Sequence, residues 1–419
     1  MKPATHSRRS FLASLGALSA AGHAWPGTVS VSSNTTTHSK GASASRGLAP
    51  SPDDFLFSPG LVYLQTGSLG PTPRPVMERT IAAWKELERN PVFYGYGPHE
   101  HAMEDVRAKA AAFVGCKTEE LVLTNCTTEG MNWIAQGLTL SAGDRVLTTD
   151  QEHPGGRVCW DYVARKHGVV IDLVVIPPGE NDASAIIDRF AKLITPRTRV
   201  LSFSHLLSST GLRMPVAELS ALARARGCIA VVDGAQAVGG IDVDVKALGC
   251  HVYATSGHKW LLAPKGTGFL YLSEELGTTV DPISLQAGRA AYSASSGVCN
   301  IPGVLGLAAA IDYLSAIGKP SIERHNLALS SRLHAALQSV PKLRVVSAPP
   351  GPLASPLVTY MLPAGIKSDA FQKGLMAKHN VVVKVVPTNW LNGNRVSTHL
   401  FNTEHDVDAL IGALNTELG

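Results

Sequence analysis

Ser256-Gly257-His258-Lys259-Trp260 is the stretch that decides the fold of this 419-residue chain, together with Asp233-Gly234-Ala235-Gln236 upstream. The apolar run from His251 to Thr255 predicts a short strand, and this strand leads into the turn that carries Lys259. Asp233 closes another β-rich run. The spacing between the two motifs leaves room for one helical segment and one strand.

The chemistry of these two motifs is specific when they occur together. A lysine in a tight turn and a carboxylate at a strand end are what pyridoxal 5'-phosphate requires from a protein. The Lys259 amine would bond to the aldehyde carbon of the cofactor. The Asp233 carboxylate would keep the pyridine nitrogen protonated, so that the ring can draw electrons from a substrate. Taken singly, each residue has a simpler interpretation, a solvated turn lysine or a helix-capping aspartate.

The ordered set of motifs resembles the class V aminotransferase family, the cysteine-desulfurase-like branch of fold type I enzymes. That family carries strand-Asp-x-x-Gln, then Ser-x-His-Lys, then a glycine-rich return strand, which here is Pro264 to Tyr271. The resemblance covers roughly Phe55 to the C-terminus. It implies a pyridoxal phosphate cofactor, a homodimer, and a small-molecule amino acid or peptide as substrate.

The order of the predicted elements indicates an α/β fold. Helical and β-rich runs alternate from Val76 to Leu272, which predicts a mostly parallel sheet with helices on both faces. We predict a large cofactor-binding domain over 53–317, including an N-terminal segment, and a small α+β domain over 318–419, as in fold type I PLP-dependent transferases. The predicted strands are 120–124, 145–149, 169–176, 199–204, 228–233, 251–255 and 268–272, then 343–346, 357–362, 381–385 and 395–398.

The cofactor phosphate is assigned to the start of a predicted helix. Thr127 and Thr128 open this helix, and the N–H groups of a helix N-terminus together with threonine hydroxyls suit a phosphate. An ordinary threonine cap is the alternative. The family has its phosphate-binding turn at this point, between the first two strands of the large domain. By the same resemblance, Ser256 and His258 are phosphate contacts beside the lysine.

Four more residues take their roles from the resemblance. His153 stands where the family stacks an aromatic ring or a histidine on the pyridine, and we count it with Lys259 and Asp233 as catalytic. Gln236 matches the residue that bonds the ring hydroxyl. Arg395 matches the arginine that holds the substrate α-carboxylate, for which the guanidinium fork is suited. Gln65 holds a position near the substrate, where the family more commonly has Asn.

Two further positions depart from the family pattern. Leu207 replaces an Asn that lies near the ring hydroxyl, so Gln236 would have to tune the ring without it. Val298 replaces a Thr that reaches the phosphate of the partner subunit, which puts that contact in doubt.

The sequence specifies the cofactor more closely than the reaction, because one fold can support several different reactions. The run from Val382 to Asn402 resembles the isopenicillin-N-epimerase-like branch, in which the α-proton is removed and replaced. Epimerisation requires a second acid/base besides Lys259, which the sequence does not identify. No cysteine follows Cys299, which argues against a cysteine desulfurase, since that enzyme carries a nucleophilic cysteine shortly before the arginine.

Other reactions stay open as alternatives. They are transaminase-like modification of an exported peptide or metabolite, and C–S lysis. A non-catalytic cofactor-binding protein is a third alternative, and the intact set of Lys259, Asp233 and Arg395 argues against it.

The N-terminus is predicted to be a bacterial targeting signal. Ser7-Arg8-Arg9-Ser10-Phe11-Leu12 precedes a short apolar run and a Gly22-His23-Ala24 cleavage-like site. We predict a twin-arginine signal peptide over 1–24, recognition by the twin-arginine export machinery, and a periplasmic or extracellular enzyme. An ordinary secretory signal is the alternative. Residues 25–52, rich in Ser, Thr, Gly and Pro, predict a disordered linker.

Composition excludes several classes of function. The net charge of +4 comes without a basic block, which argues against nucleic acid binding. Beyond the N-terminus no apolar run is long enough to span a bilayer. The six cysteines are scattered without a CxxC pair, which indicates neither a metal site nor a dense disulfide framework.

Overall fold

The computed structural model describes residues 52–386 and 390–419. The predicted signal peptide and nearly all of the predicted linker lie outside the described residues. Four short 3-10 helices lie at Pro52–Asp54, Thr118–Glu120, Glu274–Leu276 and Ile283–Leu285.

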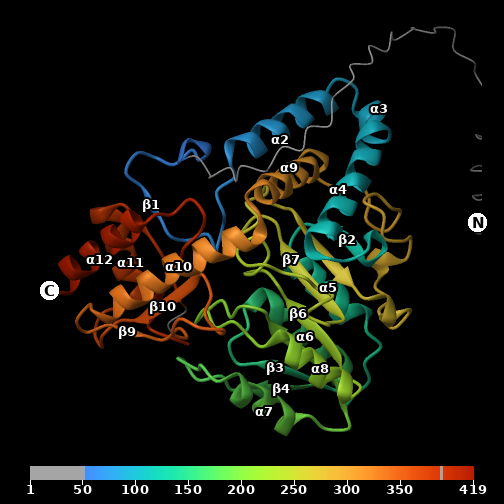
Figure 1. Ribbon diagram of the computed structural model, residues 1–419. Coiled ribbons are helices and arrows are strands. Elements are labelled where there is room, and N and C mark those ends of the chain that lie inside the picture. The colour runs from blue at the N-terminus through green and yellow to red at the C-terminus, as the bar shows by residue number, and fades with distance from the viewer. Residues whose placement is uncertain (1–51, 387–389) are drawn as a thin grey trace, which may run out of the picture. The chain divides into compact units, whose positions relative to one another are not determined.

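A seven-stranded sheet forms the larger part, in the order β2-β8-β7-β6-β5-β3-β4 (Figure 1). All neighbouring strands run parallel except at β8, which is antiparallel to both β2 and β7. The predicted α/β class with a mostly parallel sheet is therefore confirmed. The strands are β2 (Leu121–Thr124), β3 (Arg145–Thr149), β4 (Val170–Val174), β5 (Thr198–Ser204), β6 (Ile229–Asp233), β7 (Val252–Ser256) and β8 (Gly268–Leu272).

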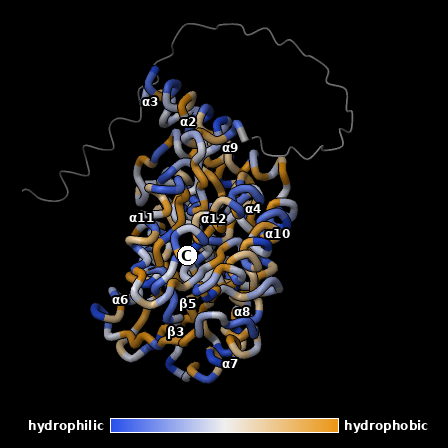
Figure 2. Tube along the Cα trace, turned by 90° about the vertical axis from the view of Figure 1, so that its left-hand side faces the viewer, coloured by the Kyte–Doolittle hydropathy of each residue, from blue (hydrophilic) through white to orange (hydrophobic). Residues whose placement is uncertain are grey.

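Hydrophobic cores lie on both faces of this sheet, as expected where helices cover a parallel sheet on each side. Side chains alternate along β5: Leu201 and Phe203 join one core, and Val200 joins the other. Figure 2 traces such hydrophobic stretches in orange, for example along β3. The helices of this part are α2 (Arg74–Leu87), α3 (Pro91–Gly95), α4 (Pro98–Val114), α5 (Thr127–Gly137), α6 (Pro154–His167), α7 (Ala183–Leu193), α8 (Val216–Ala225) and α9 (Ile301–Ile317).

The two cores use different helices. Residues of α5 and α6, among them Ile134 and Trp160, pack on the face that includes Val200. Residues of α4, α7, α8 and α9 pack on the face that includes Phe203. The indole N–H of Trp160 donates to the Ser202 hydroxyl over 2.8 Å, which satisfies a polar group inside the core.

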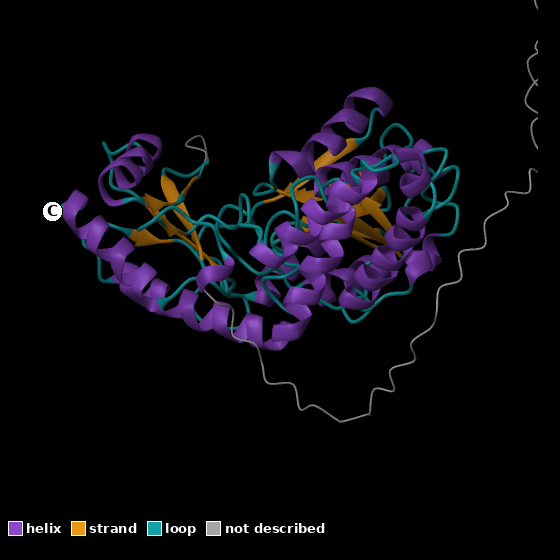
Figure 3. Cartoon of the chain, turned by 90° about the horizontal axis from the view of Figure 1, so that it is seen from above, coloured by secondary structure: helices purple, strands orange, loops and turns teal. Residues whose placement is uncertain are grey.

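The C-terminal part has its own antiparallel sheet, in the order β12-β13-β10-β9, and its own hydrophobic core (Figure 3). Its strands are β9 (Arg344–Val345), β10 (Leu357–Met361), β12 (Lys384–Val385) and β13 (Gly393–Ser397), and its helices are α10 (Lys319–Gln338), α11 (Ser368–His379) and α12 (Glu404–Leu418).

The predicted strand 381–385 is divided in two. β11 (Val381–Val382) pairs in parallel with β1 (Val62–Tyr63), whereas β12 pairs with β13. Val62 and Leu64 belong to the predicted N-terminal segment of the large domain, yet they pack in the core of the C-terminal part. The domain boundaries 53–317 and 318–419 stay a prediction.

Within residues 52–386 and 390–419, no single helix is long and apolar enough to cross a bilayer. The bent pair of α9 and α10 has the length and composition of a membrane span only when the two helices are taken together.

Candidate active site

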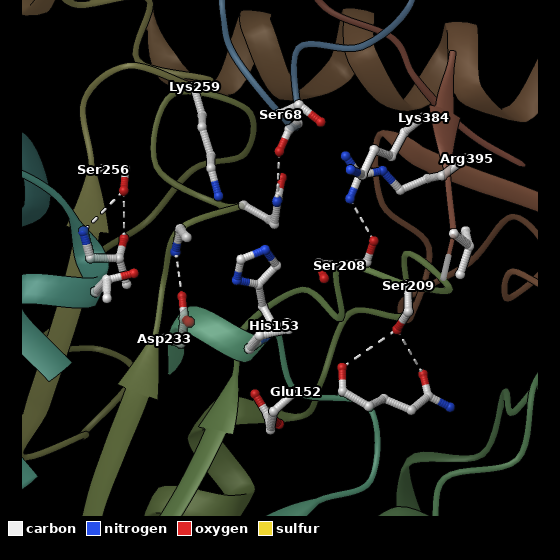
Figure 4. A pocket seen from close by; sticks show the side chains of 18 of the residues that line it. Ser68, Glu152, His153, Ser208, Ser209, Asp233, Ser256, Lys259, Lys384 and Arg395 are labelled. Carbon is white, nitrogen blue, oxygen red and sulfur yellow. Dashed lines mark hydrogen bonds between the residues drawn. The ribbon is translucent and has the colours of Figure 1, made fainter. Parts of the chain in front are cut away.

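A cavity of about 690 Å³ lies where several parallel strands of the large sheet end (Figure 4). Carboxyl ends of parallel strands meet at one edge of a sheet, which is where α/β proteins bind ligands. The loops after β2, β3, β5, β6 and β7 all contribute lining residues, and β12 and β13 of the other sheet contribute more. The predicted residues that line it are Thr127, Thr128, His153, Asp233, Gln236, Ser256, His258, Lys259 and Arg395.

Lys259 lies in a turn that packs tightly against Gly70. Gly70 N–H donates to the His258 carbonyl over 2.8 Å. A Cβ on Gly70 would lie 2.0 Å from the Lys259 carbonyl oxygen, so only glycine allows this approach. Burial lowers the pKa of Lys259 to about 8, against the opposing effect of Asp233. The amine is therefore partly unprotonated near neutral pH, as a nucleophile requires.

Asp233 is 6% exposed at the end of β6. One carboxylate oxygen accepts the N–H of Ala235 over 2.9 Å. The other lies against α6, where a Cβ on Gly156 would come within 2.6 Å of it. Burial raises the pKa of Asp233, and the Lys259 charge opposes this rise. A cationic ligand group beside the carboxylate would favour its ionised form.

The N-terminus of α5 forms an anion cradle with the end of β7. Thr127 N–H donates to Ser256 Oγ over 3.0 Å, and the two hydroxyls lie 2.8 Å apart. A Cβ on Gly155 would lie 2.5 Å from the Thr128 hydroxyl, so the start of α6 packs tightly against this cradle. Within the described residues, Nδ1 of His258 is buried without a hydrogen-bond partner. A buried polar atom of this kind is available to hydrogen-bond a bound anion.

His153 caps α6, and its Nδ1 accepts the N–H of Gly155 over 3.0 Å. Burial, then the charges of Lys259, Arg395 and Lys384, lower the pKa of His153 to about 4. The ring is therefore neutral, with its proton on Nε2. Figure 4 shows it in the cavity, below Lys259.

Gln236 is held by two protein contacts. Its amide oxygen accepts the indole N–H of Trp260 over 2.9 Å, and its amide nitrogen donates to the Gly67 carbonyl over 2.8 Å. Each end of the amide thus has one protein partner, and a ring hydroxyl would have to share one of these groups.

Arg395 is 3% exposed on β13. Its Nη1 donates to the Ser208 carbonyl. Nε and Nη2 are buried and have no hydrogen-bond partner among the described residues. Burial lowers the pKa of Arg395 to about 10, so the group is still a cation at neutral pH. Unused N–H donors on a buried guanidinium are suited to a carboxylate.

Gln65 is the one predicted site residue that does not line the cavity. Its amide donates to the Ser68 hydroxyl over 3.2 Å, and Ser68 does line it. Leu207 and Val298, the two further positions that depart from the family pattern, are not among the lining residues either. Leu207 is fully buried and Val298 is exposed. Lining residues that sequence reasoning missed include Ser68, Cys126, Glu152, Ser208, Ser209, Lys384 and Trp390.

A signal for some missed residues was present in the sequence. Glu152 and Ser208 follow the ends of β3 and β5, where lining residues of parallel sheets are expected. Lys384 gave a weaker signal, because a single lysine among valines is typical of a solvated strand face.

These residues fit pyridoxal 5'-phosphate. The cradle of Thr127 and Ser256 offers a place for its phosphate, Lys259 an amine for its aldehyde, and Asp233 a carboxylate for its ring nitrogen. A family model for class V aminotransferases matches residues 62–410. The chain belongs to the class V aminotransferase family. Class V aminotransferases work with pyridoxal 5'-phosphate, so the predicted family and cofactor are confirmed.

Similarity to individual members of the class V family extends over most of the chain. The isopenicillin N epimerase of Amycolatopsis lactamdurans is 32% identical over 86% of this chain and 96% of its own. A cysteine desulfurase of Cronobacter sakazakii is 32% identical over 74% of this chain and 81% of its own. The apo cysteine desulfurase structure from Thermococcus onnurineus has a TM-score of 0.76 at 26% identity, covering 87% of this chain and 96% of that one. The predicted fold type I architecture is thereby confirmed.

Proposed function

We propose that this class V enzyme is an epimerase, which removes and replaces the α-proton of an amino acid or of an amino-acid-containing peptide. The observation that carries the proposal is the similarity to two isopenicillin N epimerases over 86% and 87% of this chain and nearly their full lengths. The cavity supplies Arg395 for the substrate carboxylate and Lys259 as one of the two acid/base groups that epimerisation needs.

Each residue has a distinct task in the proposed reaction. Arg395 binds the substrate α-carboxylate through Nε and Nη2, which orients the α-carbon. Pyridoxal phosphate, when bound, supplies an electron sink for that carbon. Lys259 Nζ takes the α-proton on one face, for which a pKa of about 8 is suited. Asp233 holds the proton on the ring nitrogen.

Further residues hold the cofactor in this proposal. Thr127, Thr128, Ser256 and His258 bind its phosphate, and the neutral His153 ring covers the pyridine. Gln236 bonds the ring hydroxyl through whichever donor or acceptor its two protein contacts leave free.

Sulfur chemistry is the second candidate, because one observation favours it. Cys126 lines the cavity as the N-cap of α5, and cysteine desulfurases are among the relatives. The sequence argument considered only cysteines after Cys299, so it does not address Cys126. Family membership alone leaves desulfuration and C–S lysis open.

Incubation of the holoenzyme with pools of amino acids in deuterium oxide separates these reactions. Solvent deuterium at the α-carbon without keto acid is the expected result. Keto acid with an aminated cofactor would replace the proposal by transamination. With dithiothreitol present as the reductant of any persulfide, release of sulfide from cysteine or cystine, lost in a Cys126→Ala variant, would replace it by sulfur chemistry.

We also propose a homodimer. Exposed hydrophobic side chains lie on α2 and α3, namely Trp84, Val92 and Phe93. Val298, which is 63% exposed, lines one groove together with Val92. Contiguous exposed apolar side chains mark protein interfaces. Sedimentation of the mature protein should give the mass of two chains, and a fully active monomer would contradict this.

A further inference from the structure

Lys384 and Arg395 are two cations that stand opposite each other and share one cavity. They are register partners in the antiparallel pair of β12 and β13. Side chains in this relationship have Cβ atoms only about 4.5–5.5 Å apart, and like charges there are destabilising. Both residues line the cavity, and Figure 4 shows their side chains next to each other. Such an arrangement costs stability unless an anion joins it.

No carboxylate in the described part of the chain supplies that anion. In residues 52–386 and 390–419, neither cation forms an ion pair with a carboxylate, and the Lys384 amine makes no hydrogen bond. Burial lowers the pKa of Lys384, and the charge of Arg395 lowers it further. Two buried nitrogens of Arg395, Nε and Nη2, have no hydrogen-bond partner among the described residues.

The acidic residues of the cavity wall have other partners. Glu152 accepts hydrogen bonds from Thr149 and Ser204, each over 2.6 Å. Asp150 accepts the N–H of Ile176 over 3.0 Å. Asp233 is the partner assigned to the cofactor ring. The two cations are therefore available to a ligand from solution.

The cofactor phosphate is not that ligand. Ser256, which forms the phosphate cradle with Thr127, lies on the opposite side of the cavity from Lys384 and Arg395 in Figure 4, with Lys259 and His153 between. A substrate α-carboxylate can occupy the planar fork of Arg395. That leaves the charge of Lys384 without a counter-ion.

We propose that Lys384 binds a second carboxylate of the substrate. The enzyme then acts on a dicarboxylic amino acid, or on a peptide whose reacting residue carries a second carboxylate nearby. The inference rests on the proposed function in that the substrate is an amino acid held at Arg395. It adds the substrate class and a specificity-determining residue.

Binding of unreactive acids to the holoenzyme tests the inference directly. The probes are succinate, glutarate and adipate, each compared with butyrate by calorimetry at fixed ionic strength. We expect at least one dicarboxylate to bind about tenfold more tightly than butyrate, since a charged hydrogen bond contributes roughly 1.5–3 kcal/mol. Lys384→Met should abolish that preference, with butyrate affinity changed less than about twofold.

Two control variants keep the result interpretable. Lys384→Arg retains the charge and should retain the preference. Lys373→Met removes an exposed lysine of α11 outside the cavity and should change nothing. An unchanged preference in Lys384→Met overturns the inference. Equal weakening of butyrate and the dicarboxylates also overturns it, since both cations would then share a single carboxylate.

Deuterium exchange distinguishes this inference from the proposed function. If alanine and glutamate both exchange, Lys384→Met should raise KM for glutamate about tenfold and leave alanine unchanged. If no amino acid exchanges its α-proton, the epimerase proposal fails. The binding experiment still decides whether Lys384 holds a second carboxylate.

Discussion

Thr127 N–H donates to the hydroxyl of Ser256 over 3.0 Å, which ties the start of α5 to the end of β7. The Thr127 hydroxyl lies 2.8 Å from the same oxygen. Two residues 129 positions apart in the sequence thus build one corner of the cavity. The free N–H groups of the α5 N-terminus then point to the place that we assign to the cofactor phosphate.

Ser256→Ala should weaken the binding of pyridoxal phosphate by about tenfold to a hundredfold, because one hydrogen bond to a charged group is lost. Fluorescence titration of the apoenzyme measures this. Pyridoxal, which has no phosphate, serves as the matched ligand, and its affinity should stay the same. Equal weakening for both ligands would show that Ser256 supports the fold of the cavity and does not contact phosphate.

Reduction of the holoenzyme with borohydride should leave the pyridoxyl group on Lys259. Its pKa of about 8 leaves a reactive amine near neutral pH. Lys265 is the nearest competitor in sequence, but its amine donates to the Gly70 carbonyl over 2.8 Å and to Thr72 over 3.0 Å. Peptide mapping by mass spectrometry identifies the labelled lysine. Labelling of Lys265 would refute the assignment, and Lys265→Arg should leave the labelling pattern unchanged.

Asp233→Asn should preserve the fold and cofactor binding but lower kcat/KM by roughly a hundredfold or more, the size of effect that a positioned acid–base group typically contributes. An amide cannot hold the ring nitrogen in its cationic form, so the electron sink weakens. The rate of α-proton exchange, measured at saturating cofactor, compares the variant with the parent enzyme. The exposed Asp188 on α7 is a matched control, and Asp188→Asn should be as active as the parent. Near-normal turnover in Asp233→Asn would exclude this role.

Most strands of the large sheet and the central residues of the site could be predicted from the sequence. β3 and β8 have the predicted bounds because their apolar β-rich runs end at clear turn residues. Asp233 was found because it closes such a run, and Lys259 because it lies in the turn that follows one. What the sequence could not show was how distant segments meet. The Gly67 carbonyl takes one donor of Gln236, a contact between residues 169 positions apart.

The C-terminal side of the cavity was predicted less completely for a related reason. A run of valines around Lys384 favours one continuous strand, but β11 and β12 pair in different sheets. Which side Lys384 faces depends on that division, because a shift of one residue turns a side chain to the other face. Its pairing with Arg395 follows only from the register.

Glu152 should make the stability of the apoenzyme fall as the pH rises from about 4.5 to 7. Burial raises the pKa of Glu152 from 4.5 to about 7, against hydrogen bonds from Ser204 and Thr149 that lower it. In this window the folded state binds more protons than the unfolded chain, so raising the pH favours unfolding. The contribution is at most about 3 kcal/mol.

Glu152→Gln should remove this component of the pH dependence. Urea unfolding at pH 5 and pH 7.5 compares the parent, the variant and an exposed control, Glu218→Gln. The parent and the control should lose more unfolding free energy between the two pH values than Glu152→Gln does. Parallel losses in all three proteins would show that Glu152 does not titrate in this range.

Export is the remaining prediction, and it concerns residues outside the described part of the chain. Ser7-Arg8-Arg9-Ser10-Phe11-Leu12 and the short apolar run after it favour the twin-arginine route, which carries folded proteins. This suits an enzyme whose cofactor site is complete only after folding, since segments near Gly67, Ser256 and Arg395 all line it. Replacing Arg8 and Arg9 by Lys should leave active, unprocessed holoenzyme in the cytoplasm, detected by fractionation and by the absorbance of the cofactor. Processed enzyme in the periplasm of that double variant would instead favour an ordinary secretory signal, with cofactor uptake after export.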